Sequence, residues 1–292
     1  MFKLYLIFFL LFSLKSLSFD YKKDLANVSV NNGFIDENRK IYPFPGDIDK
    51  SKVILILWHH GYGGKEWTID ECWRPDPVIL KLNNKKIKDK VVKIYSLCSG
   101  VRGLNEDEWG RLYDYWLDNG KLTNELKDKN NQSLTSKLKS VRKLRILHDK
   151  LKEMRNQGFK NIVVAGHSYG GWNGFALMTY KQSYIDAVIS MTPAAGGLRE
   201  TKRKWPWMYD IMYYGWKDLS RLKGIIFHHD KDEYMSPKDY DKLRNAAKNI
   251  TWVNISNSKC ESEKYHWVTT MYCFASPENV NKVYNYLAKI YN

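Results

Sequence analysis

Short runs of apolar residues, separated by segments with helical periodicity, constrain the fold of this chain more than any other feature. A strand that is covered on both faces has a continuous apolar run rather than an alternating pattern. Strands that alternate with helices predict an α/β fold in which a mostly parallel central sheet is flanked by helices. Functional sites in such sheets form beyond the carboxyl ends of the strands. The runs that predict strands are VILILW at 53–58, VVKIYSLC at 91–98, NIVVAG at 161–166, IDAVISM at 185–191, GIIFHH at 224–229 and TWVNIS at 251–256.

The segments between these runs carry helix signals, namely apolar spacing of three or four residues and residues that favour helix ends. One expected helix runs from Leu138 to Met154, with Gly158 beyond its end. A second begins at about Tyr169 and a third at Pro237. The last begins at a Ser276–Pro277 cap and continues to the end of the chain.

The length of 292 residues, with 43% hydrophobic residues, is enough for one large core. We therefore expect a single α/β domain over residues 19–292. Three segments fall outside the strand–helix pattern: an irregular or edge-strand lead-in at 19–50, an inserted excursion at 99–136 and a small lid insertion at about 194–222.

The first 18 residues resemble an export signal. Lys3 supplies a positive start, and residues 4–12 form an apolar run that is too short to span a bilayer. Ser16 and Ser18 are small residues at a spacing that suits cleavage after Ser18. An uncleaved membrane anchor is the alternative. The favoured interpretation predicts a secreted or periplasmic protein with no stable membrane insertion after cleavage.

The four cysteines are compatible with such a location, because an exported chain meets an oxidising compartment. Four cysteines allow three pairings, and the sequence does not choose among them. We favour the local pairs, Cys72–Cys98 and Cys260–Cys273.

The formal net charge of +15 favours anionic surfaces or substrates. The lysines are scattered rather than grouped, and the chain carries no nucleic-acid-binding motif. We interpret the charge mainly as a solvated basic surface and expect no nucleic-acid partner. The oligomeric state stays open.

The stretch GHSYGG at 166–171 places one serine among glycines, directly after a predicted strand and before a predicted helix. Gly166, Ser168 and Gly170 fit the pattern G-x-S-x-G. Its physical demand is a strained turn with the serine at its apex, where glycines remove Cβ atoms that would collide. A plain glycine-rich turn is the alternative, but the position between strand and helix favours an exposed nucleophile.

With this motif, the chain resembles the α/β-hydrolase superfamily over most of residues 50–292. The resemblance rests on HHGYGG at 59–64, GHSYGG, the segment HHDKDEYMSP at 228–237 and His266. The family has its nucleophile, acid and base in that order along the chain. The resemblance therefore implies Ser168 as nucleophile, Asp232 as acid and His266 as base. Asp230 is the alternative acid, since His229 stands where the family often has glycine.

The resemblance also implies an oxyanion hole, in which two backbone N–H groups stabilise the negative oxygen of a tetrahedral intermediate. Tyr62, in the first glycine-rich loop, and Tyr169, after the nucleophile, are the expected donors. This mechanism needs no metal and no cofactor.

The expected activity is that of an exported serine hydrolase that cleaves carboxylic esters through an acyl-enzyme. The expected substrate is a small-molecule ester or acyl compound. If it is anionic, the basic lid residues that could meet its charge are Arg199, Lys202, Arg203 and Lys204. In the lid, Trp205, Trp207 and Tyr213 are candidates to contact it, and packing of these aromatic rings is the alternative. Two other functions stay open: a serine peptidase or amidase on the same triad, and a catalytically silent binding protein with an aromatic, basic lid.

Overall fold

A computed structural model describes residues 32–61, 75–98, 132–204, 209, 212–213, 216–260 and 262–292. The predicted export signal at 1–18 and most of the predicted excursion at 99–136 lie outside these ranges. Within them, no helix is long and apolar enough to cross a membrane.

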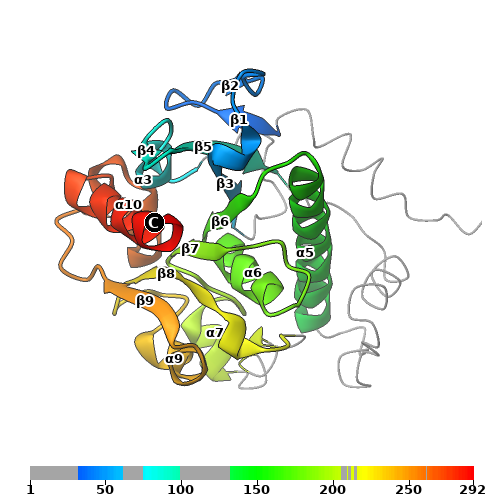
Figure 1. Ribbon diagram of the computed structural model, residues 1–292. Helices are drawn as coiled ribbons and strands as arrows, with labels where there is room; N and C mark the ends of the chain where they lie inside the picture. Colours follow the sequence, from blue (N-terminus) through cyan, green and yellow to red (C-terminus); the bar gives the residue numbers. More distant parts are fainter. Residues whose placement is uncertain are drawn as a thin grey trace, which may run out of the picture.

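The centre of the fold is a mixed sheet whose long strands are parallel (Figure 1). All pairs from β5 through β9 along the sheet are parallel, whereas β1 pairs antiparallel with both β2 and β5, and β4 pairs antiparallel with β5. The predicted mostly parallel α/β sheet is therefore confirmed, with an antiparallel edge formed by the lead-in. In spatial order the strands are β2 (Ile41–Tyr42), β1 (Gly33–Ile35), β5 (Lys90–Leu97), β3 (Val53–His59), β6 (Asn161–His167), β7 (Ala187–Met191), β8 (Lys223–His228) and β9 (Asn249–Asn254), and β4 (Lys86–Ile87) lies beside β5.

The order of the strands creates a switch point between β3 and β6. The chain leaves β3 toward β5 on one side, whereas it leaves β6 toward β7 on the other side. Connections that depart in opposite directions open a crevice at the carboxyl ends of the two strands, where ligands of open α/β sheets bind. Here those ends carry His59–Gly61 and Ser168.

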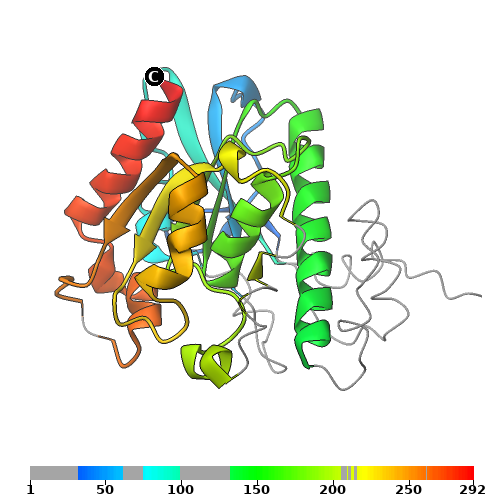
Figure 2. The ribbon, with the colours of Figure 1, turned by 90° about the horizontal axis from the view of Figure 1, so that it is seen from below.

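Helices cover both faces of the sheet. Successive side chains of a strand point to opposite faces, so the apolar strands contribute to an apolar cluster on each face. Val53, Leu55 and Leu57 of β3 join one apolar cluster with α5 (Gln132–Asn156) and α6 (Tyr169–Met178). The intervening side chains join a second cluster with α3 (Pro77–Leu80) and α10 (Pro277–Tyr291). Figures 1 and 2 show α5 and α10 on opposite sides of the sheet.

The helix signals of the sequence correspond to observed elements. The side chain of Ser276 accepts a hydrogen bond from the Asn279 N–H and caps α10, as its position before Pro277 predicts. Pro237 opens a 3-10 turn rather than an α-helix directly. Shorter elements are η2 (Lys50–Lys52), α7 (Arg199–Lys204), η4 (Leu219–Arg221), η5 (Pro237–Tyr240), α9 (Asp241–Ala246), η6 (Tyr265–Thr270) and η7 (Tyr272–Phe274).

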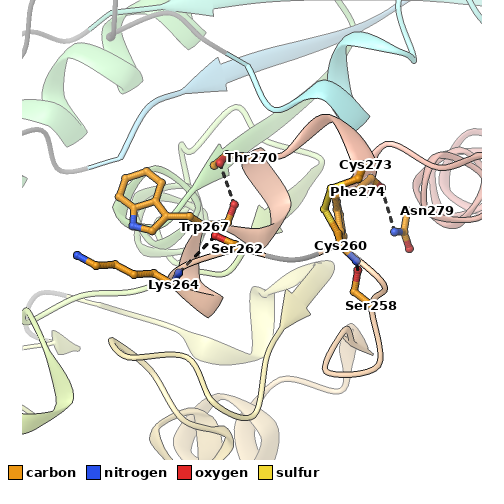
Figure 3. Close-up of a disulfide and its surroundings, with 9 residues drawn as sticks. All are labelled: Ser258, Cys260, Ser262, Lys264, Trp267, Thr270, Cys273, Phe274 and Asn279. Atoms are coloured by element: carbon orange, nitrogen blue, oxygen red, sulfur yellow. Dashed lines mark hydrogen bonds between the residues drawn. A yellow bond between two sulfur atoms is a disulfide. The ribbon is translucent and has the colours of Figure 1, made fainter.

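A disulfide joins Cys260 to Cys273, so the local pairing that the sequence favoured is present (Figure 3). It closes the segment that contains η6, η7 and His266. Cys98 is also disulfide-bonded, and Cys72, its expected partner, lies outside the described residues.

The packing of α5 against the sheet gives a stability prediction. Leu151 is fully buried in the cluster between α5 and the sheet. We expect Leu151→Ala to lower the free energy of unfolding by about 2–5 kcal/mol, because it removes apolar contacts and leaves a cavity. Lys152→Ala, at the exposed neighbouring position, is the matched control and should change it by less than about 0.5 kcal/mol. Equilibrium unfolding in urea measures both, and similar small effects would contradict this packing.

Candidate active site

Ser168 makes the turn between β6 and α6, and its backbone is strained. Its φ of 52° and ψ of −123° lie in a region that residues with a side chain rarely adopt. Two backbone hydrogen bonds hold the turn: the Ser168 N–H donates to the Met191 carbonyl at 2.9 Å, and the Ser168 carbonyl accepts from the Trp172 N–H at 3.2 Å. The side chain is partly exposed. The turn therefore presents a hydroxyl at the carboxyl end of β6.

The glycines on either side of Ser168 permit this turn by close approach. A Cβ on Gly166 would lie 2.5 Å from the backbone carbonyl carbon of Gly170. A Cβ on Gly170 would overlap the His59 carbonyl oxygen. Only glycines let α6 begin this close to the ends of β3 and β6, so the motif has the steric purpose that the sequence indicated.

A buried hydrogen bond joins His266 to Asp232. Their side chains are each 1% exposed, and the His266 Nδ1 lies 2.8 Å from the Asp232 Oδ2. The alternative acid, Asp230, is exposed and accepts from the Asn254 side-chain amide at 3.0 and 3.1 Å. The structure thus brings Asp232, and not Asp230, to the histidine.

The Asp232 carboxylate is itself held by the backbone of its loop. Its Oδ1 accepts from the N–H groups of Tyr234 at 2.7 Å and Met235 at 3.1 Å. Both oxygens are therefore engaged, which fixes the direction from which the carboxylate meets His266.

The main chain of His266 is fixed from both sides. Its carbonyl oxygen accepts from the Thr192 Oγ1 at 2.8 Å and lies 2.9 Å from the His167 Nε2. The Glu233 carboxylate accepts from the N–H groups of Tyr265 and His266, both at 3.0 Å. Burial, together with the nearby His266, lowers the pKa of His167 to about 3. His167 is therefore neutral and donates from Nε2.

These supporting roles were not predicted from the sequence. In the sequence, His167 is part of the G-x-S-x-G motif, and Glu233 lies in the acidic segment that follows β8. Thr192 follows β7 directly, so its place at a carboxyl strand end is the one signal that pointed to it.

Three parts of the expected site meet at the switch point of the sheet. The ring centroids of His167 and His266 are 4.8 Å apart, which places His266 beside the residue that precedes Ser168. A Cβ built on Gly61 would lie 3.4 Å from the Ser168 Cβ. Ser168, His266 and the glycine-rich loop after β3 are therefore neighbours.

The glycine-rich loop is anchored by a buried lysine. The Lys143 Nζ on α5 donates to the Gly61 carbonyl at 2.6 Å. Burial, followed by the charge of Lys143, lowers the pKa of His59 to about 3 and that of His60 well below its usual range. Both histidines are therefore neutral parts of the strand end.

The structure describes one of the two expected oxyanion donors. Tyr62 lies outside the described residues. Tyr169 is the first residue of α6 and follows the nucleophile, so its N–H stands at the positive end of the helix, where negative charge is stabilised.

Of the three lid residues that were candidates for substrate contact, the structure describes Tyr213. Trp205 and Trp207 lie outside the described residues. The Tyr213 ring packs on Trp172 and Trp216, at centroid distances of 5.2 Å for each pair, and its hydroxyl donates to the Asp239 carbonyl. Tyr213 thus has the packing role that the sequence left open.

Lys202, which was expected to meet an anionic group, is fully buried. Its ammonium donates to the Ala195 carbonyl at 3.1 Å and to the Tyr234 carbonyl, and burial lowers its pKa to about 8. This expectation was wrong for Lys202, because the backbone carbonyls of Ala195 and Tyr234 accept hydrogen bonds from its ammonium group inside the protein.

The strand order and the strained turn at Ser168 define a protein with the α/β-hydrolase fold. Comparison of the chain with protein-family models and with curated proteins gives no match. Among solved structures, an esterase of Pyrococcus furiosus is similar, with 14% identity, a TM-score of 0.43 and 84% of each chain covered.

Two further solved structures are similar. MGS-M1, an α/β-hydrolase enzyme from a Medee basin deep-sea metagenome library, is 15% identical with a TM-score of 0.45 and covers 89% of this chain and 97% of its own. Esterase 2 of Thermogutta terrifontis is 12% identical with a TM-score of 0.47 and covers 89% and 95%. At these sequence identities and TM-scores the similarity does not identify functional residues, so the roles proposed below rest on the geometry of this chain.

The anchoring of His266 by Glu233 gives a prediction about local stability. We expect Glu233→Ala to remove the acceptor of two N–H groups and to speed amide hydrogen exchange at residues 265–266 by roughly 10- to 100-fold. Hydrogen exchange followed by mass spectrometry measures this. Glu263→Ala, at an exposed position in the same segment, is the matched control, and equal exchange in the two variants would contradict the anchoring role.

Proposed function

We propose that the protein is a serine hydrolase that cleaves carboxylic esters through an acyl-enzyme intermediate. The observation that carries this proposal is the buried Asp232–His266 pair beside the strained turn at Ser168. A buried carboxylate and imidazole are costly to place in a core without a purpose. Their position beside an exposed hydroxyl at a sheet switch point supports nucleophilic catalysis.

In the proposed mechanism, each group has one role. The His266 Nε2 takes the proton of the Ser168 Oγ as this oxygen attacks the ester carbonyl carbon. Asp232 holds the His266 Nδ1–H and stabilises the imidazolium, without taking the proton. His266 then protonates the leaving alkoxide, and the ester C–O bond breaks. Water, activated by the same histidine, hydrolyses the acyl-enzyme and regenerates Ser168.

The developing negative charge needs aimed donors. The Tyr169 N–H, at the start of α6, is the donor that the described residues support. The Tyr62 N–H is proposed as the second donor. The Lys143 contact with the Gly61 carbonyl supports this, because a peptide unit is planar and trans. Fixing that carbonyl also fixes the direction in which the N–H of the same peptide unit points.

Esters are proposed rather than amides because their leaving groups need less assistance. The peptidase or amidase alternative uses the same groups, and a substrate panel separates the two. A catalytically silent protein would have no use for the buried pair. The Cys260–Cys273 disulfide is compatible with the proposed extracytoplasmic location.

The proposed nucleophile is tested with a fluorophosphonate probe. We expect one covalent adduct on Ser168, mapped by mass spectrometry of peptides, and loss of labelling in His266→Ala, which cannot activate the hydroxyl. Labelling at another residue, or none in folded protein, would contradict the proposal. Hydrolysis of p-nitrophenyl esters beside aminoacyl amides then separates esterase from amidase.

The choice of acid is tested by a matched pair of substitutions. We expect Asp232→Asn to lower kcat by roughly 10⁴-fold, because the amide leaves His266 in the wrong tautomer. Asp230→Asn, two residues away and exposed, should change kcat by less than about threefold. Comparable losses in both variants would show that the acid is assigned wrongly.

The anchoring lysine is tested through kcat. We expect Lys143→Met to lower kcat roughly 10- to 100-fold with little change in KM, because the loop loses the contact that orients it. Lys152→Met, at an exposed position of the same helix, is the control. A rise in KM at unchanged kcat would refute a role in the transition state.

A further inference from the structure

A cavity of about 410 Å³ lies at the carboxyl end of β3, next to the nucleophile. Gly61, which packs close to Ser168, and His167, which precedes Ser168 in the sequence, both line this cavity. Its volume falls in the range of about 300–1,000 Å³ that small-molecule sites occupy. Substrate attached at the reacting carbonyl would therefore reach this cavity.

The cavity wall carries buried polar groups without partners. Asp76 is 2% exposed. Among the described residues, its Oδ2 has no hydrogen-bond partner, and neither has the Nε1 of the buried Trp58 or the Nε of Arg39. All three residues line the cavity. Burial raises the pKa of Asp76 to about 7, although Thr269 and Arg39 lower it. Unpaired buried groups are costly, and native proteins retain few without a reason.

Aromatic side chains form the outer part of the same wall. Trp267 and Tyr272 line the cavity and are 36% and 71% exposed. The Arg39 guanidinium lies 5.4 Å from the centroid of the Tyr272 ring. Both aromatic residues belong to the segment closed by Cys260–Cys273, and Figure 3 shows the Trp267 indole on the side of the segment away from the disulfide. A cross-linked segment presents these rings at a low entropic cost.

We propose that this cavity binds a sugar ring of the substrate, so that the enzyme removes acyl groups from carbohydrate hydroxyls. This inference rests on the proposed function. A sugar ring has an apolar C–H face, which packs on aromatic rings, and hydroxyls that both donate and accept. Asp76 brings an acceptor and Arg39 brings donors to the cavity wall. An aliphatic acyl chain would leave these polar groups unpaired.

The proposed reaction is an ordinary ester hydrolysis. The ester C–O bond breaks, the acyl group forms a bond to the Ser168 Oγ, and the sugar oxygen leaves with the proton from His266. Water then releases the carboxylic acid.

The cavity assignment is tested by binding, independently of turnover. Full-length Ser168→Ala protein is titrated with methyl β-D-glucopyranoside and methyl β-D-xylopyranoside, followed by saturation-transfer NMR. We expect Tyr272→Ala to weaken binding roughly three- to tenfold and Tyr272→Phe to retain it. Tyr265→Ala, in the same segment but outside the cavity wall, is the control and should bind like the parent. Asp76→Asn should also weaken binding, because it replaces an acceptor oxygen with a donor.

Turnover gives the second measurement. With Ser168 present, Tyr272→Ala should lower kcat/KM for acetylated methyl glycosides and leave p-nitrophenyl acetate within twofold. Absence of glycoside binding in a protein that hydrolyses p-nitrophenyl acetate would overturn the inference alone. A changed acyl chain-length preference in Tyr272→Ala without an effect on glycosides would assign the cavity to the acyl group instead. Glycoside binding without turnover of any ester would keep the cavity assignment and refute the proposed function.

Discussion

The close approach of helix α6 to the end of strand β3 is the contact on which the rest of the structure depends. Side chains at Gly166 and Gly170 would collide with backbone atoms there. Where the backbones meet directly, Ser168 takes a positive φ, and its side chain is partly exposed. The same approach brings Gly61 against Ser168. One steric constraint thus places Ser168 and the glycine-rich loop together at the switch point of the sheet.

The histidine is positioned by a shell that depends little on its own side chain. Thr192 and His167 hold its carbonyl, Glu233 holds its N–H, and the disulfide closes the segment around it. Asp232 then has to fix only the imidazole ring. A general base acts only within hydrogen-bond reach of the group whose proton it takes. A segment that is fixed at several points therefore positions His266 better than one strong contact would. The same rigidity holds Trp267 and Tyr272 beside the cavity.

The sequence predicted the strands and the elbow because both have local causes. Continuous apolar runs indicate buried strands, and G-x-S-x-G is a steric requirement written in adjacent residues. Asp232 was favoured over Asp230 through family resemblance and spacing, and the hydrogen bond to His266 agrees with it. Lys143 could not be predicted in the same way, because its partner, Gly61, lies 82 residues away and nothing local distinguishes its side chain. Thr192 lies at a carboxyl strand end, but its partner, His266, lies 74 residues away. Lys202 was misjudged for the same reason, because a buried lysine looks like a surface lysine until its carbonyl partners are known.

A crystal structure of the protein after reaction with a diethyl phosphonate inhibitor tests directly whether Ser168 is the nucleophile beside an oxyanion hole. We expect a covalent bond from phosphorus to the Ser168 Oγ, with the phosphoryl oxygen about 2.7–3.1 Å from the Tyr169 N. The His266 Nε2 should lie within hydrogen-bond distance of the Ser168 Oγ. An adduct on another residue, or a phosphoryl oxygen turned away from the start of α6, would contradict the account.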